Sequence, residues 1–210
     1  MRTTKNLILA LLKRTGGNTV SELTQALGLA SMTVRQHLIA LERDALIQAR
    51  EVRNGNGRPH YLYSLTAKAD ETFPKRYDWL ATSLLEEVAF LQPEEIAGLP
   101  PDARQQLLLR KLGARMANQY ADQVNGRPLE ELVVFVTEVL QEESGFAEWK
   151  KNDRGYEIRA CNCPYSKVSE INHHLCEWHM QFLSELLDRP VKSDHRLSNG
   201  GNCCQFLVEL

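Results

Sequence analysis

Three short amphipathic segments followed directly by two alternating strands fill the first 65 residues, and few folds accommodate that order. The first segment carries apolar side chains at helical spacing and stops at a glycine pair, Gly16 and Gly17. The second begins at Thr19, which has Glu22 three residues later as in a capping box, and it stops at Gly28. These signals predict two helices, each ended by glycine.

A third helix is predicted to start at Ser31, immediately after a short turn that begins at the glycine. Such a turn makes the two helices cross steeply, which is the helix-turn-helix arrangement. Residues 46–52 and 60–65 then alternate as strands around the polar tip at 54–57. A helix-turn-helix with a hairpin directly behind it is a winged helix, and we predict a DNA-binding domain of this class over residues 1–70.

The predicted DNA contacts lie on the third helix, away from its apolar stripe, and around the hairpin tip. They are Ser31, Met32, Thr33, Arg35, Gln36, Arg53, Asn56 and Arg58, with Arg43 as a further candidate. Arginine suits guanine and glutamine suits adenine in the major groove, whereas an arginine at the tip suits phosphate or the minor groove. The alternative is a helical module for protein contacts, on which these side chains are merely solvated.

The charge distribution supports a polyanionic partner for this domain only. The whole chain has a net charge of −2. Residues 1–70 hold ten Lys/Arg and five Asp/Glu, a balance of +5, and the rest holds fifteen and twenty-two, a balance of −7. A basic segment attached to an acidic body indicates that the first domain, and not the second, binds nucleic acid.

Residues 71–127 are predicted to be helical, with apolar positions at helical spacing between proline and glycine breaks. Two long helices, near 77–91 and 102–125, are the main elements of this region. Helices of this kind beside a winged helix commonly form a dimer interface, although both stripes could also pack within one subunit. We expect a homodimer, because two DNA-binding domains reach two half-sites about one helical turn, ~34 Å, apart.

Residues 128–210 combine helical and strand patterns, unlike the helical region before them. They are predicted to form a small α+β domain that begins with a helix at 129–141. Further strands and one mostly helical stretch are expected at 146–151, 156–160, 168–187, 191–197 and 205–210. The fold class of the chain is therefore mainly α, and α+β overall: a winged helix, central dimerisation helices and a C-terminal sensor domain.

All five cysteines lie in this last region, whereas cysteines that only fill a core would be scattered. They are Cys161, Cys163, Cys176, Cys203 and Cys204. Zinc is one explanation, with His173, His174 and His179 as further ligands, but the cysteine pairs are closer together than in usual zinc sites. An iron–sulfur cluster is a second, and a disulfide that joins Cys203 or Cys204 to Cys161 or Cys163 is a third.

A longer pattern includes three of these cysteines. Cys163-Pro164 is followed after eleven residues by Cys176-Glu177, then by Leu186-Leu187-x3-Val191, and Gly200-Gly201 precedes Cys204. With the N-terminal winged helix, this pattern resembles the SufR family of iron–sulfur-biogenesis repressors. The resemblance covers essentially the whole chain, and the C-terminal spacing is its specific part.

The resemblance implies a dimeric repressor that binds operator DNA while its C-terminal cysteines hold a [4Fe–4S] or [2Fe–2S] cluster, and that is released when the cluster is lost. By position, the implied ligands are Cys163, Cys176 and Cys204. Some members have a further cysteine between the second and the last, and this chain has none between Cys176 and Cys203. The candidates for the fourth ligand are Cys161, Cys203, His173, His174 and His179, besides a carboxylate or water.

The remaining function classes follow from the same residues. A winged-helix regulator that responds to zinc, to thiol oxidation or to an organic effector, without a cluster, is the alternative function. An enzyme with Cys176 and His173 or His179 as a nucleophile pair is disfavoured, because no oxyanion-hole signature or phosphate loop accompanies them. The longest apolar run is too short to span a bilayer and no signal peptide is evident, so we expect a cytoplasmic protein with no membrane partner.

Overall fold

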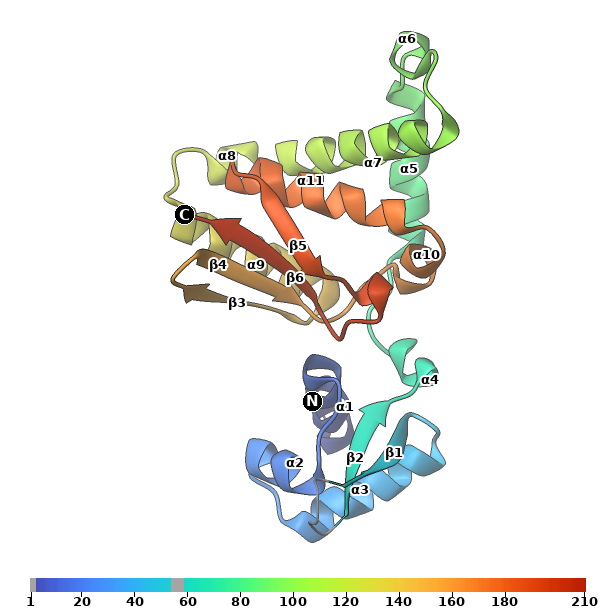
Figure 1. Cartoon of the computed structure of the whole chain (residues 1–210), viewed down its shortest axis with the longest axis vertical. Coiled ribbons are helices and arrows are strands. Elements are labelled where there is room, and N and C mark those ends of the chain that lie inside the picture. Colours follow the sequence, from blue (N-terminus) through green and yellow to red (C-terminus); the bar gives the residue numbers. More distant parts are fainter. Residues whose placement is uncertain (1–2, 54–58) are drawn as a thin grey trace. The chain divides into compact units, whose positions relative to one another are not determined.

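The computed structural model describes residues 3–53 and 59–210 (Figure 1). The chain divides into two compact units, Met1–Phe73 and Pro74–Leu210. Each unit has its own buried apolar core. The fold class predicted from the sequence, mainly helical with a winged helix and a small C-terminal sheet, is confirmed.

The N-terminal unit is a helix-turn-helix followed by a hairpin. Its elements are α1 (Thr4–Thr15), α2 (Val20–Leu27), α3 (Ser31–Arg43), β1 (Ile47–Val52), β2 (His60–Leu65) and α4 (Ala67–Asp70). Gly16 and Gly28 end the first two helices with φ angles of 79° and 64°, which side chains disfavour. Both arms of the predicted capping box between Thr19 and Glu22 are present.

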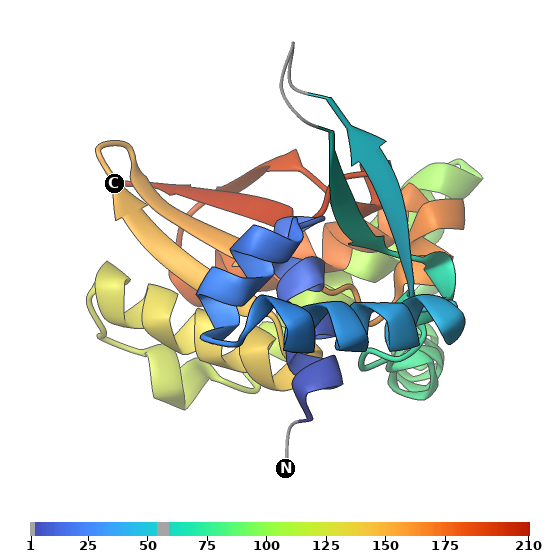
Figure 2. The same cartoon turned by 90° about the horizontal axis from the view of Figure 1, so that it is seen from below.

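The hairpin is tied to the helices as well as to itself. β1 and β2 pair antiparallel from Ile47–Leu65 to Val52–His60. Asn18, in the segment before α2, exchanges two backbone hydrogen bonds of 2.9 Å with Tyr63 of β2. The strands project beyond the helices in Figure 2. This attachment gives the wing a fixed base.

The C-terminal unit packs helices on one face of a sheet. Its elements are α5 (Tyr77–Phe90), α6 (Pro93–Ile96), α7 (Pro101–Asn118), α8 (Ala121–Val124), α9 (Leu129–Ser144), β3 (Ala147–Asn152), β4 (Gly155–Ala160), α10 (Ser166–Ile171), η1 (His173–Leu175), α11 (Cys176–Leu187), β5 (Val191–His195), η2 (Leu197–Asn199) and β6 (Cys204–Glu209). The sheet order is β3-β4-β6-β5, with antiparallel pairs.

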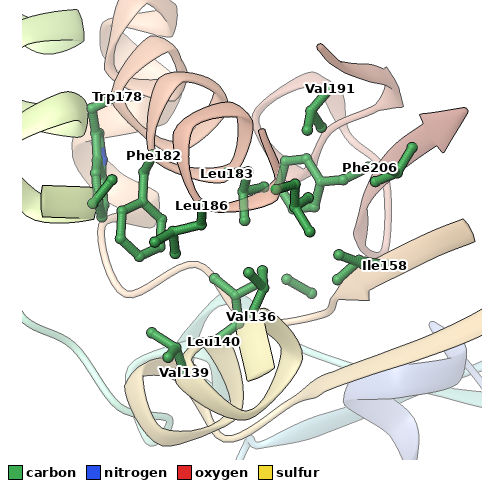
Figure 3. Close-up of a cluster of buried hydrophobic side chains, with 14 of the residues drawn as sticks. Val136, Val139, Leu140, Ile158, Trp178, Phe182, Leu183, Leu186, Val191 and Phe206 are labelled. Carbon is green, nitrogen blue, oxygen red and sulfur yellow. The ribbon is translucent and has the colours of Figure 1, made fainter. Parts of the chain in front are cut away.

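A single apolar cluster joins the helices of this unit to the sheet (Figure 3). Leu80 of α5 and Leu112 of α7 belong to the same cluster as Val136 of α9, Phe182 of α11 and Ile158 of β4. The sequence predicts a helical region at 71–127 separate from a sensor domain at 128–210, whereas in the structure both stretches contribute to one core. No helix among the described residues is long and apolar enough to cross a membrane.

Two of the predicted helices are interrupted in the structure. The helix expected at 102–125 is interrupted between α7 and α8, where Tyr120 packs edge-on against Phe135 and Phe182. The mostly helical stretch expected at 168–187 is divided at Asn172, which is extended and whose side chain accepts a hydrogen bond from the His174 N–H. Tertiary packing explains the first break and a local cap explains the second.

The contact between α7 and α11 is close because it is made at a glycine. A Cβ atom added at Gly113 of α7 would lie 2.5 Å from the Trp178 carbonyl oxygen and 2.9 Å from the Gln181 Cβ. Real Cβ atoms essentially never approach a neighbour so closely. The two helix backbones therefore require a residue without a side chain at this crossing.

Replacing Gly113 by alanine is predicted to destabilise the C-terminal unit. Alanine in a helix ordinarily makes a protein more stable than glycine does, by roughly 0.5–1 kcal/mol. Overpacking lowers the stability by about 1–3 kcal/mol. The sign of the change in the free energy of unfolding therefore distinguishes the two effects. Denaturant unfolding of Gly113→Ala should give a lower free energy of unfolding than the natural chain. A stability equal to or above that of the natural chain would contradict the close helix crossing.

Candidate functional site

The outer face of α3 has the composition expected of a recognition helix. Val34, Leu38 and Leu41 are buried against the rest of the N-terminal unit. The predicted contacts on the opposite face, Ser31, Met32, Arg35 and Gln36, are exposed, and Thr33 is half-buried. A helix anchored by one apolar stripe and carrying Arg and Gln on the other side suits base edges in the major groove.

One further exposed side chain on this face, Ile39, was not predicted from the sequence. Ile39 is 66% exposed, comparable with 67% for Met32 seven residues earlier. It follows Arg35 by four residues, so it continues the same face of the helix. An exposed aliphatic side chain there suits a thymine methyl group. Extending the predicted face by one helical turn would have found it.

The hairpin residues are only partly described. Arg53, just beyond β1, is exposed, and its Nε lies 2.8 Å from the Glu51 Oε1. This ion pair is at the surface, where such pairs contribute little to stability, so Arg53 remains free to exchange its partner for phosphate. Asn56 and Arg58, the other predicted contacts, lie outside the described residues. Arg43 is exposed near the C-terminal end of α3, with its Nε 3.7 Å from Asp44.

In the C-terminal unit, the cysteines implied by the family resemblance meet at one cavity. Cys163 follows β4, Cys176 is the first residue of α11, and Cys204 is the first residue of β6. All are free and half-buried, and they line an enclosure of about 30 Å³. Residues 41 positions apart in the sequence thus present thiols to one small volume.

Each of these thiols has a weak hydrogen-bond partner. The Cys163 Sγ lies 3.7 Å from the Ser169 Oγ, and the Cys176 Sγ lies 3.7 Å from the Ser198 Oγ. The Leu197 N–H donates to the Cys204 Sγ at 3.4 Å. Hydrogen bonds to cysteine sulfur are among the features by which a protein tunes a thiolate–iron centre.

Burial shifts the pKa values of ionisable side chains that line the cavity. It raises the pKa of Cys163, and it raises the pKa of Cys204 to about 12. It lowers the pKa of His179, which also lines the cavity, to about 4. At neutral pH the two thiols are therefore protonated and the imidazole is neutral. A metal that binds these sulfurs must displace their protons, so its binding strengthens as the pH rises.

The other predicted ligand candidates lie elsewhere or are already bonded. Cys161 and Cys203 are joined as a disulfide, which leaves neither thiol available to a metal. His173 is exposed. The His174 Nδ1 lies 3.3 Å from the Gln106 Nε2 of α7, and His174 does not line the thiol cavity. Of the histidines considered from the sequence, His179 alone lines it.

A second small cavity shares part of this wall. It also has a volume of about 30 Å³, and Cys163, His179 and Cys204 line it together with Glu143 and Asn162. The Glu143 Oε2 and the Asn162 Oδ1 are buried and have no hydrogen-bond partner. Burying an acceptor without a partner costs about 1–3 kcal/mol, so these oxygens favour a donor that enters or turns toward this cavity.

A single metal ion would need several ligand atoms at one point of the thiol cavity. Among residues 3–53 and 59–210, no three His, Cys, Asp or Glu side chains are grouped closely enough to hold one metal ion. Zinc needs its ligand atoms within about 2.0–2.3 Å of one point. The arrangement described here therefore does not form a closed zinc site.

Comparison with known proteins identifies the first domain. Residues 1–48 match the family described as winged helix-turn-helix DNA-binding. No curated protein matches the chain. A solved structure that is similar is the crystal structure of Bacillus subtilis PadR in complex with operator DNA, with 19% identity and a TM-score of 0.28, covering 65% of this chain and 90% of that one. The chain thus carries a winged helix-turn-helix DNA-binding domain at its N-terminus.

Removing the Arg35 side chain is predicted to weaken specific DNA binding. A well-placed Arg–guanine contact contributes roughly 1–3 kcal/mol of discrimination, so Arg35→Ala should lower the affinity about tenfold or more and relax the preference at one base pair. Binding sites are first selected from random duplex DNA with the natural protein, and affinities are then measured by titration.

Arg110→Ala is the matched control, because it removes the same charge from an exposed position of α7, in the other unit. It should leave both affinity and base preference unchanged. If Arg35→Ala binds the selected sites as tightly and as selectively as the natural protein, Arg35 does not contact the bases.

Proposed function

We propose that the protein is a dimeric transcriptional repressor that binds operator DNA through α3 and the wing and senses iron–sulfur status through Cys163, Cys176 and Cys204. The observation that carries the sensing part of the proposal is the meeting of these free thiols, from separate segments, at one cavity. The DNA-binding part rests on the winged helix-turn-helix domain.

The donor set suits a cluster better than a single ion. In a [4Fe–4S] cluster each cysteine binds its own iron, and in a [2Fe–2S] cluster the ligands are divided between two irons, so the sulfurs surround a volume instead of converging on one point. The three thiols line one enclosure without forming a single-ion group among the described residues. A volume of about 30 Å³ corresponds to about one water molecule, so a cluster requires the walls to move apart.

The walls that must move are the segments that carry the cysteines. Cys163 lies in the connection between β4 and α10, and Cys204 follows the connection between η2 and β6. A bound [4Fe–4S] or [2Fe–2S] cluster would tie these segments to the first turn of α11. Loss of the cluster would return the thiols to the weak hydrogen bonds that they make in this structure.

A movement of the segments that carry the cysteines can be transmitted to the other helices of the C-terminal unit. Cys176 begins α11, and α11 contacts α7 at Gly113 through the backbone of Trp178. α7 is joined in turn to α5, because the Arg115 Nε donates to the buried Glu87 Oε2 at 2.6 Å. A shift of the first turn of α11 would therefore be transmitted to α5 through packed backbone and a partly buried ion pair.

α5 is the element that we assign to the dimer interface. Leu85, Val88 and Phe90 are 73%, 52% and 60% exposed, although they are large and apolar. Apolar side chains gathered on one exposed helix are typical of a protein interface. A second copy of the chain is the partner that operator binding favours, because two linked domains reach two half-sites. A change in α5 then alters the spacing of the DNA-binding domains.

Replacing Cys176 by serine is predicted to abolish cluster binding. The natural protein, purified without oxygen, should be brown and contain matched amounts of iron and sulfide. Cys176→Ser should be colourless, with unchanged helical content by circular dichroism, because the residue lies at the cavity and outside the apolar cluster.

The matched control is the double variant Cys161→Ser with Cys203→Ser, which removes the two bridged cysteines and spares the three implied ligands. It should remain brown. A natural protein that is colourless and resists reconstitution with iron and sulfide would overturn the sensing proposal, and so would a Cys176→Ser variant with a full complement of iron.

Placing a charge on α5 is predicted to separate the dimer. Each Leu85 buried in an interface contributes roughly 1.5–3 kcal/mol, and Leu85→Glu also forces a carboxylate to stay solvated. Sedimentation should show a dimer for the natural protein and a monomer for Leu85→Glu. Ile171→Glu, at an exposed apolar residue of α10, is the control and should remain dimeric. A dimeric Leu85→Glu would remove α5 from the interface.

A second candidate function is favoured by the Cys161–Cys203 disulfide. Under this second hypothesis, the protein is a DNA-binding regulator that responds to thiol oxidation and holds no cluster. It predicts that dithiothreitol, which reduces disulfides, changes the DNA affinity of a colourless, iron-free protein. The sensing proposal predicts instead that DNA affinity follows cluster content.

A further inference from the structure

Three cysteine ligands leave one coordination position of the proposed centre to another group. Clusters held by protein usually take four side-chain ligands, and histidine replaces cysteine in some of them. This chain has no cysteine between Cys176 and Cys203 that could serve. The identity of the fourth ligand must therefore come from what else surrounds the thiols.

His179 is the nitrogen ligand that the fold brings to the thiols. It lies three residues after Cys176 on α11, so the two side chains share one face of the helix. It lines the thiol cavity with Cys163, Cys176 and Cys204, and it also lines the adjoining cavity with Cys163 and Cys204. No other residue of the chain that is a usual nitrogen ligand lines either enclosure among the described residues.

The His179 ring is held in place by packing and is not engaged by competing hydrogen bonds. Its centroid lies 3.9 Å from the Trp178 ring and 6.1 Å from the Tyr165 ring. Within residues 3–53 and 59–210 we find no hydrogen bond to either ring nitrogen. An oriented imidazole without a fixed partner is suited to bind a metal.

The adjoining cavity supplies an acceptor for the second ring nitrogen. A histidine that binds a metal through one nitrogen almost always donates its other N–H to a carboxylate or a carbonyl oxygen. The Glu143 Oε2 and the Asn162 Oδ1 are buried, lack partners and line this cavity together with His179. The Asn162 amide is oriented by donating to the Pro74 and Ser144 carbonyl oxygens at 3.1 Å each. The Glu143 Oε1 is paired with the Arg76 Nη1 at 3.4 Å, so the Oε2 is the oxygen of this carboxyl that is left for a donor in the cavity.

We propose that His179 is the fourth ligand of the centre formed by Cys163, Cys176 and Cys204, with Glu143 or Asn162 accepting a hydrogen bond from its second ring nitrogen. This assignment rests on the proposed function. It also supplies the ligand that a further cysteine would otherwise provide. The disulfide at Cys161 and Cys203, the exposure of His173 and the contact of His174 with Gln106 remove the other candidates.

The direct test is spectroscopic and uses the full-length natural protein. The protein is produced with ¹⁵N-labelled histidine, purified without oxygen and reduced with dithionite, and the paramagnetic cluster is examined by pulsed electron paramagnetic resonance. A nitrogen ligand produces a strong nuclear coupling that changes with the isotope. We expect that coupling in the natural protein and its loss in His179→Cys, which should retain its iron because a thiolate replaces the imidazole.

Variants add a second readout. His179→Ala should lose its cluster in air about tenfold or more faster than the natural protein, because even the loss of a group that only orients a metal ligand typically weakens a metal site about 10–100-fold. His174→Ala is the control and should lose it at the natural rate. If His179→Ala fails to fold, the isotope experiment on the natural protein decides alone.

The outcomes separate this assignment from the function on which it rests. A brown natural protein without an isotope-sensitive nitrogen coupling would overturn the assignment of His179 and leave the proposed function standing. The coupling in the natural protein, lost in His179→Cys and kept in His174→Ala, would establish it. A natural protein without iron or sulfide would overturn the proposed function and the assignment together.

Discussion

The antiparallel pairing of β4 with β6 determines where most of the cysteines lie. The last residue pair of this ladder is Ala160 with Cys204. Immediately beyond it Cys161 faces Cys203, and the two are bridged, while Cys163 follows in the next connection. A shift of the pairing by one residue would turn Cys204 to the opposite face of the sheet and away from the cavity. The register of two strands far apart in the sequence is thus the condition for the thiol site.

The second condition is the placement of α11 over that end of the sheet. Its first residue, Cys176, completes the thiol set, and its next turn adds His179. The helix is fixed from the other side by its close crossing with α7 at Gly113. One helix therefore connects the thiol cavity to α7 and, through Arg115 and Glu87, to α5. A change at the cavity and a change in α5 are linked by the same packed elements.

The sequence was most informative where structure is determined locally. The winged helix was predictable because Gly16 and Gly28 end helices and the Thr19–Glu22 pair starts one, all within a few residues of the positions they control. The thiols were recognised as a set by their spacing and by a family resemblance. Their meeting at one cavity, and the exclusion of Cys161 and Cys203, depend on the β4–β6 register, which no local pattern determines. The break at Tyr120 was missed for the same reason, since it is explained by distant aromatic rings.

The central claim is that the presence or absence of a cluster at the thiol cavity controls the affinity of the winged helix for DNA. The most direct test is the affinity of one anaerobic preparation for a selected DNA site, measured before and after its iron is removed by oxidation and chelation. The account predicts that the stripped protein binds about tenfold or more weakly, the size of an ordinary coupling between two sites. Equal affinities for the loaded and the stripped protein would contradict it.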